Sequence, residues 1–322
     1  MNKLVKILLV LLGVLVLLGG AGYGWAWVRT SQLRSRTIET HRVDFPVPFP
    51  LSDEERSGLD STADAAAVAL ARAIERGRHL VSSRYVCTEC HGASLGGGVM
   101  IDDPMIGQAL GPNITLGSGS RTATYGPADW DRAVRHGVSI EGHPTVMPAV
   151  DFQLMSDQEL SDVVAYVRSM PPVDNEVPPV RFGPLGTVLM ATGALPFSAD
   201  LMPSHSDPHA AFPPAAEVSL DFGRHLAGIC AGCHGADFAG GPIPGGDPSW
   251  PPAMNLTPHA DALGGWSYED FAAALREGTR PNGATLVAPM SNVIPFTRNM
   301  TEVELQALWT YLESVPALAP AS

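Results

Sequence analysis

Two five-residue segments contain the residues of this chain that are best able to do chemistry, residues 87–91 (CTECH) and residues 230–234 (CAGCH). In a C-x-x-C-H segment both thiols lie on one turn of helix, where they can form thioether bonds to the vinyl groups of one porphyrin. The histidine that follows is placed to bind the haem iron. The sequence therefore predicts two covalently bound haem c groups, held by Cys87, Cys90 and His91 and by Cys230, Cys233 and His234.

Other uses of a C-x-x-C pair fit this chain less well. A zinc ribbon places its two pairs roughly 15–20 residues apart, so that four sulfurs converge on one metal, whereas about 140 residues separate the pairs here. A thioredoxin-like redox pair follows a strand, and neither segment has a strand-like run before it. The two segments hold all four cysteines, so none remains for a disulfide framework or a reactive nucleophile.

The surroundings of the two segments form an internal repeat. GRHL precedes each of them, at residues 77–80 and 223–226, and HGA follows the second cysteine of each. Three later matches have the same order: PNIT with MNLT (112–115, 254–257), WDRAVRHG with FAAALREG (130–137, 271–278), and LSDVVAYVRSMP with LQALWTYLESVP (160–171, 305–316). The chain thus contains one haem module twice.

The repeat also selects candidates for the sixth iron ligand. Met147 lies 56 residues after His91, and Met290 lies 56 residues after His234. A single methionine is ordinarily core filler, but the matched spacing predicts that these two bind the irons.

Two alternatives remain open for these ligands. Met147 is followed by Pro148, which fixes an extended loop, whereas in the second module the proline is displaced to Pro295. This difference makes Met300 the main competitor at the second haem. His143 is a weaker competitor at the first.

Each module resembles a class I cytochrome c domain, and the whole chain resembles the membrane-anchored dihaem cytochromes c of bacteria. The shared features are a helix leading to C-x-x-C-H, a Pro-Asn loop, a methionine-bearing loop and a C-terminal helix with an aromatic residue. The resemblance implies an all-α fold with two tandem haem domains. It also implies that the Pro112 carbonyl accepts the ring N–H of His91, with Met254 in the corresponding place of the second module.

The N-terminus predicts a membrane anchor. Residues 7–28 contain no charge and would span roughly 33 Å as a helix, enough for a hydrocarbon core of about 30 Å. Tyr23, Trp25 and Trp27 lie at the far end, where an aromatic belt is expected. A signal peptide has a shorter apolar core, although residues 19–21 (GGA) keep cleavage open. By the resemblance, haem attachment occurs outside the cytoplasmic membrane, which places both haem domains on the periplasmic or extracellular side of a single-pass protein.

The rest of the chain is predicted to be organised around the two modules. The predicted parts are an anchor (1–28), an extended proline-containing tether (29–62), a first haem domain (63–172), a proline-rich linker (173–214) and a second haem domain (215–318). Residues 92–126 are expected to form a glycine-rich loop around the haem. Capping boxes at 156–159 and 301–304 are expected to start the last helix of each module. The uncharged stretch 185–195 is predicted to be a short helix that packs between the modules rather than against a membrane.

The net charge of the chain and the predicted ligands of the irons together indicate its function. The formal charge of −13 argues against nucleic acid as a partner and fits docking to a basic patch on a redox protein. Histidine and methionine together close the iron to substrates, which favours outer-sphere transfer of single electrons over enzyme chemistry. Expected partners are a quinol-oxidising complex, a periplasmic dehydrogenase, a terminal oxidase or another cytochrome. Two alternatives are a dihaem peroxidase, which needs an open iron with acid–base groups above it, and a redox or ligand sensor.

Overall fold

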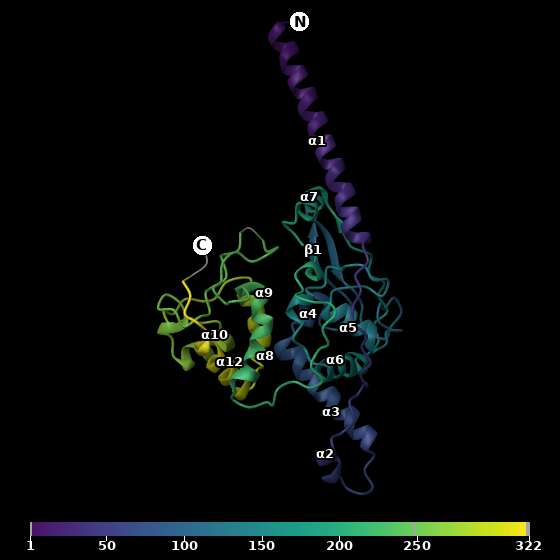
Figure 1. Cartoon of the computed structure of the whole chain (residues 1–322), viewed down its shortest axis with the longest axis vertical. Coiled ribbons are helices and arrows are strands. Elements are labelled where there is room, and N and C mark those ends of the chain that lie inside the picture. Colours follow the sequence, from purple (N-terminus) through teal and green to yellow (C-terminus); the bar gives the residue numbers. More distant parts are fainter. Residues whose placement is uncertain (1, 248, 320–322) are drawn as a thin grey trace.

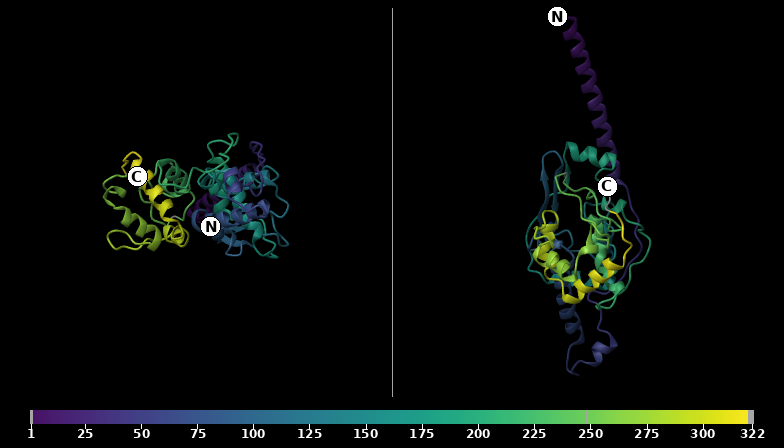
Figure 2. Two further views of the ribbon diagram at one scale, coloured as in Figure 1. Left: turned by 90° about the horizontal axis from the view of Figure 1, so that it is seen from below. Right: turned by 90° about the vertical axis from the view of Figure 1, so that its left-hand side faces the viewer.

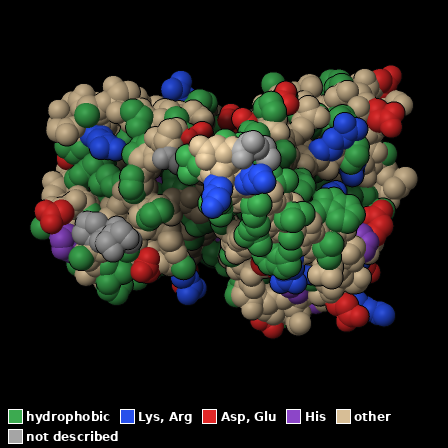
Figure 3. All heavy atoms as spheres, turned by 90° about the horizontal axis from the view of Figure 1, so that it is seen from above, with side chains coloured by type: hydrophobic (Ala, Val, Ile, Leu, Met, Phe, Trp, Pro, Cys, Tyr) green, Lys and Arg blue, Asp and Glu red, His purple; other side chains and the backbone are tan. Residues whose placement is uncertain are grey.

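The computed structural model describes residues 2–247 and 249–319. It consists of two mostly helical domains side by side, with one long N-terminal helix, α1 (Lys3–Ser35), extending away from the first domain (Figure 1). Seen from the α1 end, the molecular surface has two lobes, and the hydrophobic side chains of α1 gather over the first of them (Figure 3).

The first domain is built on the crossing of α3 (Ala65–His79) and α6 (Asp157–Ser169). A Cβ placed on Gly77 would lie 2.0 Å from the backbone oxygen of Asp162, so only glycine allows these helices to approach so closely. The attachment segment forms α4 (Cys87–His91), and the repeated segment that starts at Trp130 lies mostly in α5 (Pro127–Arg135). Leu160, Val164 and other buried residues of α6 complete the core.

The second domain repeats this crossing with α8 (Leu220–Ala227) and α12 (Glu302–Ser314). A Cβ on Gly223 would lie 2.1 Å from the backbone oxygen of Ala307. The glycine of each GRHL segment therefore marks the point where the first helix of a module meets the last. The remaining helices of this domain are α9 (Ala231–His234), α10 (Tyr268–Glu277) and α11 (Met290–Thr297).

Both predicted capping boxes are confirmed. The Ser156 and Thr301 hydroxyls accept hydrogen bonds from the backbone N–H groups of Glu159 and Glu304, whose carboxylates in turn accept the N–H groups of the caps. Short single turns lie between the helices: α2 (Asp53–Ser57), η1 (Leu80–Arg84), η2 (Ala149–Asp151), η3 (Ser198–Asp200), η4 (Gly228–Cys230) and η5 (Leu263–Gly265).

The predicted loop around the first haem contains a small sheet. Strands β1 (Gly98–Asp103) and β2 (Gly107–Gly111) form an antiparallel hairpin, and β3 (Arg181–Phe182) from the linker pairs with β2. The fold is helical as predicted. The hairpin was not predicted, because this glycine-rich segment lacks the alternation of apolar and polar residues that indicates a strand.

The linker helix lies elsewhere than predicted. α7 (Pro184–Thr192) packs against the base of α1, not between the domains (Figures 1 and 2). The hydroxyl of Thr30 donates a hydrogen bond to the Thr187 carbonyl at 2.8 Å, and Thr30 and Ala26 are the buried residues of α1. Helix α1 continues to Ser35, seven residues beyond the predicted anchor.

Candidate haem sites

In the first site, α4 presents His91 at its last position. His91 Nδ1 lies 2.8 Å from the Pro112 carbonyl oxygen, which confirms the hydrogen bond expected from the resemblance. Because a carbonyl only accepts, Nδ1 is the protonated nitrogen, and the lone pair of Nε2 remains for iron. Burial lowers the pKa of His91, so the imidazole is kept in the neutral form that a metal needs.

The second site repeats this arrangement. His234, the last residue of α9, has Nδ1 2.7 Å from the Met254 carbonyl oxygen. Burial lowers the pKa of His234 as well. The proline of the first module is thus dispensable here, because the interaction uses the backbone carbonyl.

The four cysteines form no disulfide. Burial raises the pKa of Cys87 to about 12 and that of Cys230 to about 12, so neither environment favours a thiolate. Redox exchange and zinc binding both use the thiolate. These environments therefore fit thioether attachment better than either alternative.

The first domain encloses a cavity of about 320 Å³. Cys87, Cys90, His91 and Met147 line it, as does Trp130, whose indole Nε1 is buried with no hydrogen-bond partner among the described residues. A buried donor without an acceptor is costly, and a carboxylate of a bound porphyrin would supply one. The residues present therefore fit a haem.

The structure also separates the candidate ligands of the first iron. Met147 lies on the cavity wall in the loop before η2. Met155 reaches the same cavity but is 2% exposed and belongs to the hydrophobic core. His143 Nδ1 lies 3.1 Å from the Arg36 carbonyl, so this ring contacts the tether. This favours Met147, whose role stays a prediction.

In the second domain the two candidates have different surroundings. Met290, the first residue of α11, is partly buried against the domain core, whereas Met300 belongs to the core itself at 8% exposure, just before α12. Met300 thus occupies the place that Met155 has before α6. The Met290 assignment also stays a prediction.

Backbone contacts correct one detail of the methionine loops. Thr145 N donates to the Gly137 carbonyl and Leu286 N to the Gly278 carbonyl, both at 2.7 Å. Counted from these two glycines, the proline equivalent to Pro148 is residue 289, not Pro295. In the second module the proline therefore precedes the methionine, since Met290 lies 12 residues after its glycine and Met147 lies 10 residues after Gly137.

The two haem sites are close in space. Gly232 lies within the second C-x-x-C-H segment, and a Cβ placed on it would be 1.9 Å from Asp151 Oδ1. Asp151 ends η2, the turn that follows Met147. The turn that follows Met147, the predicted ligand of the first iron, therefore touches the attachment segment of the second site. Burial at this contact raises the pKa of Asp151 to about 7.

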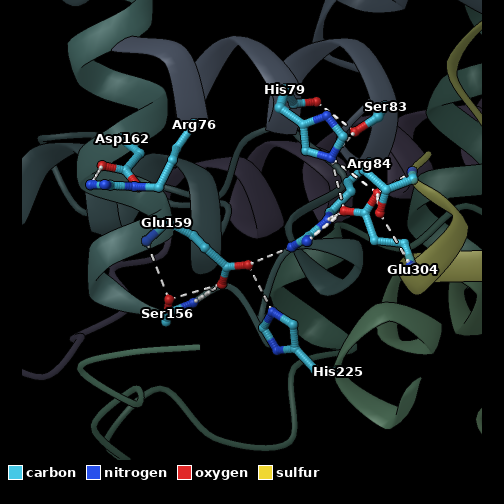
Figure 4. Close-up of polar contacts among 10 residues, drawn as sticks. Arg76, His79, Ser83, Arg84, Ser156, Glu159, Asp162, His225 and Glu304 are labelled. Atoms are coloured by element: carbon cyan, nitrogen blue, oxygen red, sulfur yellow. Dashed lines mark hydrogen bonds and ion pairs between the residues drawn. The ribbon is translucent and has the colours of Figure 1, made fainter. Parts of the chain in front are cut away.

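The domains are joined by a reciprocal polar interface that sequence reasoning missed (Figure 4). His79 Nε2 lies 2.8 Å from Glu304, and His225 Nε2 lies 2.8 Å from Glu159. The histidine of each GRHL segment thus contacts the capping glutamate of the other domain. Arg84 joins the two pairs, with nitrogens 3.0 Å from Glu159 and 2.6 Å from Glu304.

The sequence did contain an indication of this interface. Both the GRHL histidine and the capping glutamate recur in the two modules. The first module also has three more residues than the second between that histidine and the first cysteine. The π-helical turn η1, which carries Arg84, lies in this longer segment. Such turns often occur at functional sites.

Comparison with known proteins agrees with this geometry. Residues 72–167 match the family described as "Cytochrome C oxidase, cbb3-type, subunit III", and residues 223–316 match the family "Cytochrome c". Both matches fall inside the two predicted haem domains, whose boundaries stay predictions.

Several characterised proteins are similar along most of the chain. It is 29% identical to the cytochrome c subunit of alcohol dehydrogenase (quinone) of Gluconacetobacter polyoxogenes, over 73% of this chain and 53% of that protein. It is 27% identical to the fructose dehydrogenase cytochrome subunit of Gluconobacter japonicus (76% and 53%) and 27% identical to a diheme cytochrome c-type protein of Cereibacter sphaeroides (72% and 82%). The chain spans about half the length of the two dehydrogenase subunits. With a cytochrome c domain in each repeat, the chain belongs to the cytochrome c proteins and carries two haem c groups.

Proposed function

We propose that this chain relays single electrons between redox proteins, as the cytochrome subunit of a dehydrogenase. The contact between η2 and the second attachment segment is the observation that carries the proposal, because it brings the two haem sites together. The relatives named as dehydrogenase cytochrome subunits support it. Its second redox partner would be a quinol-oxidising complex, a terminal oxidase or another cytochrome.

In this proposal His91 and Met147 bind the first iron, and His234 and Met290 bind the second. A bound haem supplies the reversible one-electron chemistry. A backbone carbonyl fixes each imidazole. The methionine thioethers would be the second protein ligands of the two irons and would leave no place for a substrate. Peroxide cleavage needs an open iron, so this ligation favours the relay over the peroxidase alternative.

Removing one attachment site should halve the electron capacity. The variant C230A/C233A, and separately C87A/C90A, should contain one haem per chain by pyridine haemochrome assay instead of two. After stoichiometric reduction, the intact protein should deliver two electrons per chain to ferricytochrome c, and each variant should deliver one. The two variants control for each other if one domain fails to fold. Two electrons from either variant, or rapid turnover of hydrogen peroxide by the intact protein, would contradict the relay.

We further propose that α1 anchors the chain in the bacterial cytoplasmic membrane, with both haem domains outside the cytoplasm. Among the described residues α1 is the one helix with the length and composition to span a bilayer. Its apolar side chains from Leu4 to Leu18 are mostly exposed, and Trp25 and Trp27 are exposed beyond them. The full chain should stay with membranes washed at high salt, whereas a chain that starts at Arg29 should be released. A mature N-terminus near residue 22, found by mass spectrometry, would instead identify a cleaved signal sequence.

A further inference from the structure

Outside the haem sites, three histidines from distant parts of the sequence converge on the first domain. His136 follows the end of α5, His41 lies in the tether, and His209 lies in the linker. The ring centroids of each pair are 5.1–5.2 Å apart. Asp131 of α5 adds a carboxylate, and one donor atom of each of the four residues lies within 4.8 Å of the others. His136 and Asp131 are fully buried.

The spacing of the donor atoms is that of a metal site. His136 Nε2 lies 3.3 Å from His209 Nε2 and 3.5 Å from Asp131 Oδ2, and His209 Nε2 lies 3.6 Å from Asp131 Oδ1. Around a tetrahedral zinc ion with bonds of about 2.0–2.1 Å, neighbouring ligand atoms are about 3.3 Å apart. Three of the four groups therefore already have nearly the separation that one small cation would impose.

Hydrogen bonds behind the cluster determine which nitrogen of His136 carries the proton and which carries the lone pair. His205 Nε2 lies 3.0 Å from the Ala199 carbonyl oxygen, which only accepts, so Nε2 of His205 carries the proton. In a neutral imidazole with its proton on Nε2, Nδ1 is the acceptor. His136 Nδ1 lies 3.1 Å away and donates to it. The lone pair of His136 is thus on Nε2, directed into the cluster, as in histidines oriented for a metal.

The surroundings of the other members also suit a cation. His41 Nδ1 is buried and has no hydrogen-bond partner among the described residues. The Asp131 carboxylate accepts a hydrogen bond from Arg135 Nε at 2.7 Å through Oδ1. Arg135 also pairs with Asp157, so its charge is shared between two carboxylates.

We propose that His41, His136, His209 and Asp131 bind one divalent transition-metal ion of the zinc class. Imidazole nitrogens suit Zn²⁺, and a four-ligand set without an open position is typical of structural zinc. The ion would hold the tether and the linker against the first domain, where His41 N already donates to the His205 carbonyl at 2.8 Å. This site is independent of the electron relay.

The test is zinc binding to the intact dihaem protein after dialysis against a chelator. Calorimetric titration with Zn²⁺ should give one ion per chain, counted as zinc by mass spectrometry so that haem iron does not interfere. The extended X-ray absorption fine structure at the zinc edge should indicate four nitrogen or oxygen ligands at about 2.0–2.1 Å, with the outer-shell scattering of imidazole rings. His209→Ala and His41→Ala should each weaken binding about 100-fold. His205→Ala should weaken it by about 10–100-fold, because it orients His136 without touching the ion.

His259→Ala is the matched control, since this histidine lies in the second domain outside the cluster; it should leave affinity unchanged. His41 and His209 lie outside the regular helices and strands, and an unchanged haem spectrum would show that these variants fold. Zinc binding that survives in both His209→Ala and His41→Ala would overturn the proposal. It would also be overturned if the intact protein bound less than about 0.2 zinc ions per chain, because one closed site should bind one ion. A site that takes Cu²⁺ but not Zn²⁺ would overturn the choice of ion.

Discussion

Met147→Ala should open the iron of the first haem and leave the second closed. Without the thioether the iron loses its sixth ligand, so the reduced variant should bind one carbon monoxide per chain, where the intact protein binds none. The potential of that haem should fall by on the order of 0.1 V, a modest part of the about 0.8 V range that axial ligands control. Both changes are measured by visible spectroscopy, the second during a redox titration.

Met155→Ala is the matched control, because Met155 lines the same cavity from within the core. It should cost about 2–5 kcal/mol of stability as a core truncation and bind no carbon monoxide. Met290→Ala and Met300→Ala form the corresponding pair in the second domain. If Met155→Ala opened the iron and Met147→Ala did not, the ligand assignment would be wrong.

Arg84→Met should strongly weaken the contact between the domains. It leaves the carboxylates of Glu159 and Glu304, both nearly fully buried, with histidine and capping contacts only. Removing one partner of a buried ion pair typically costs about 3–5 kcal/mol, and the loss should appear as a lower midpoint of denaturation by guanidinium. Arg224→Met is the control. Arg224 and Asp221 are both exposed, so this change should stay within about 0.5 kcal/mol.

The effect of Arg84→Met should depend on pH. Although burial opposes it, the His79 hydrogen bond and the Arg84 charge lower the pKa of Glu304 to about 2 from an ordinary 4.5. A lowered pKa contributes stability above the unfolded value that is lost as the pH falls through the folded value. The difference between the intact protein and the variant should therefore be full near neutral pH and shrink between about pH 4.5 and pH 2. Equal midpoints at neutral pH would show that Arg84 does not hold the domains together.

Features encoded by neighbouring residues were predictable from the sequence. The C-x-x-C-H segments, the repeat and the capping boxes each depend on residues a few positions apart, and the structure has the helices that they predict. The glycine of GRHL is visibly repeated in the sequence. The structural reason for it, the close crossing of two helices at Gly77 and at Gly223, becomes clear only in the structure. Haem attachment, the strongest functional prediction, is likewise a local pattern.

Features made by distant segments were not predictable. The histidine cluster joins the tether, the end of α5 and the linker, and none of these carries a spacing typical of metal ligands. The contact of α7 with α1 was missed because an uncharged helix has no polar face to indicate what it packs against. The reciprocal interface combined two repeated motifs whose partners lie in the opposite module.

Carbon monoxide binding to the dithionite-reduced, detergent-solubilised intact protein, with the haem content measured beside it, tests the relay most directly. Two closed His/Met irons predict two haems per chain and no spectral change with the gas. Binding by either haem would show an open iron, and the peroxidase alternative would then take the place of the relay.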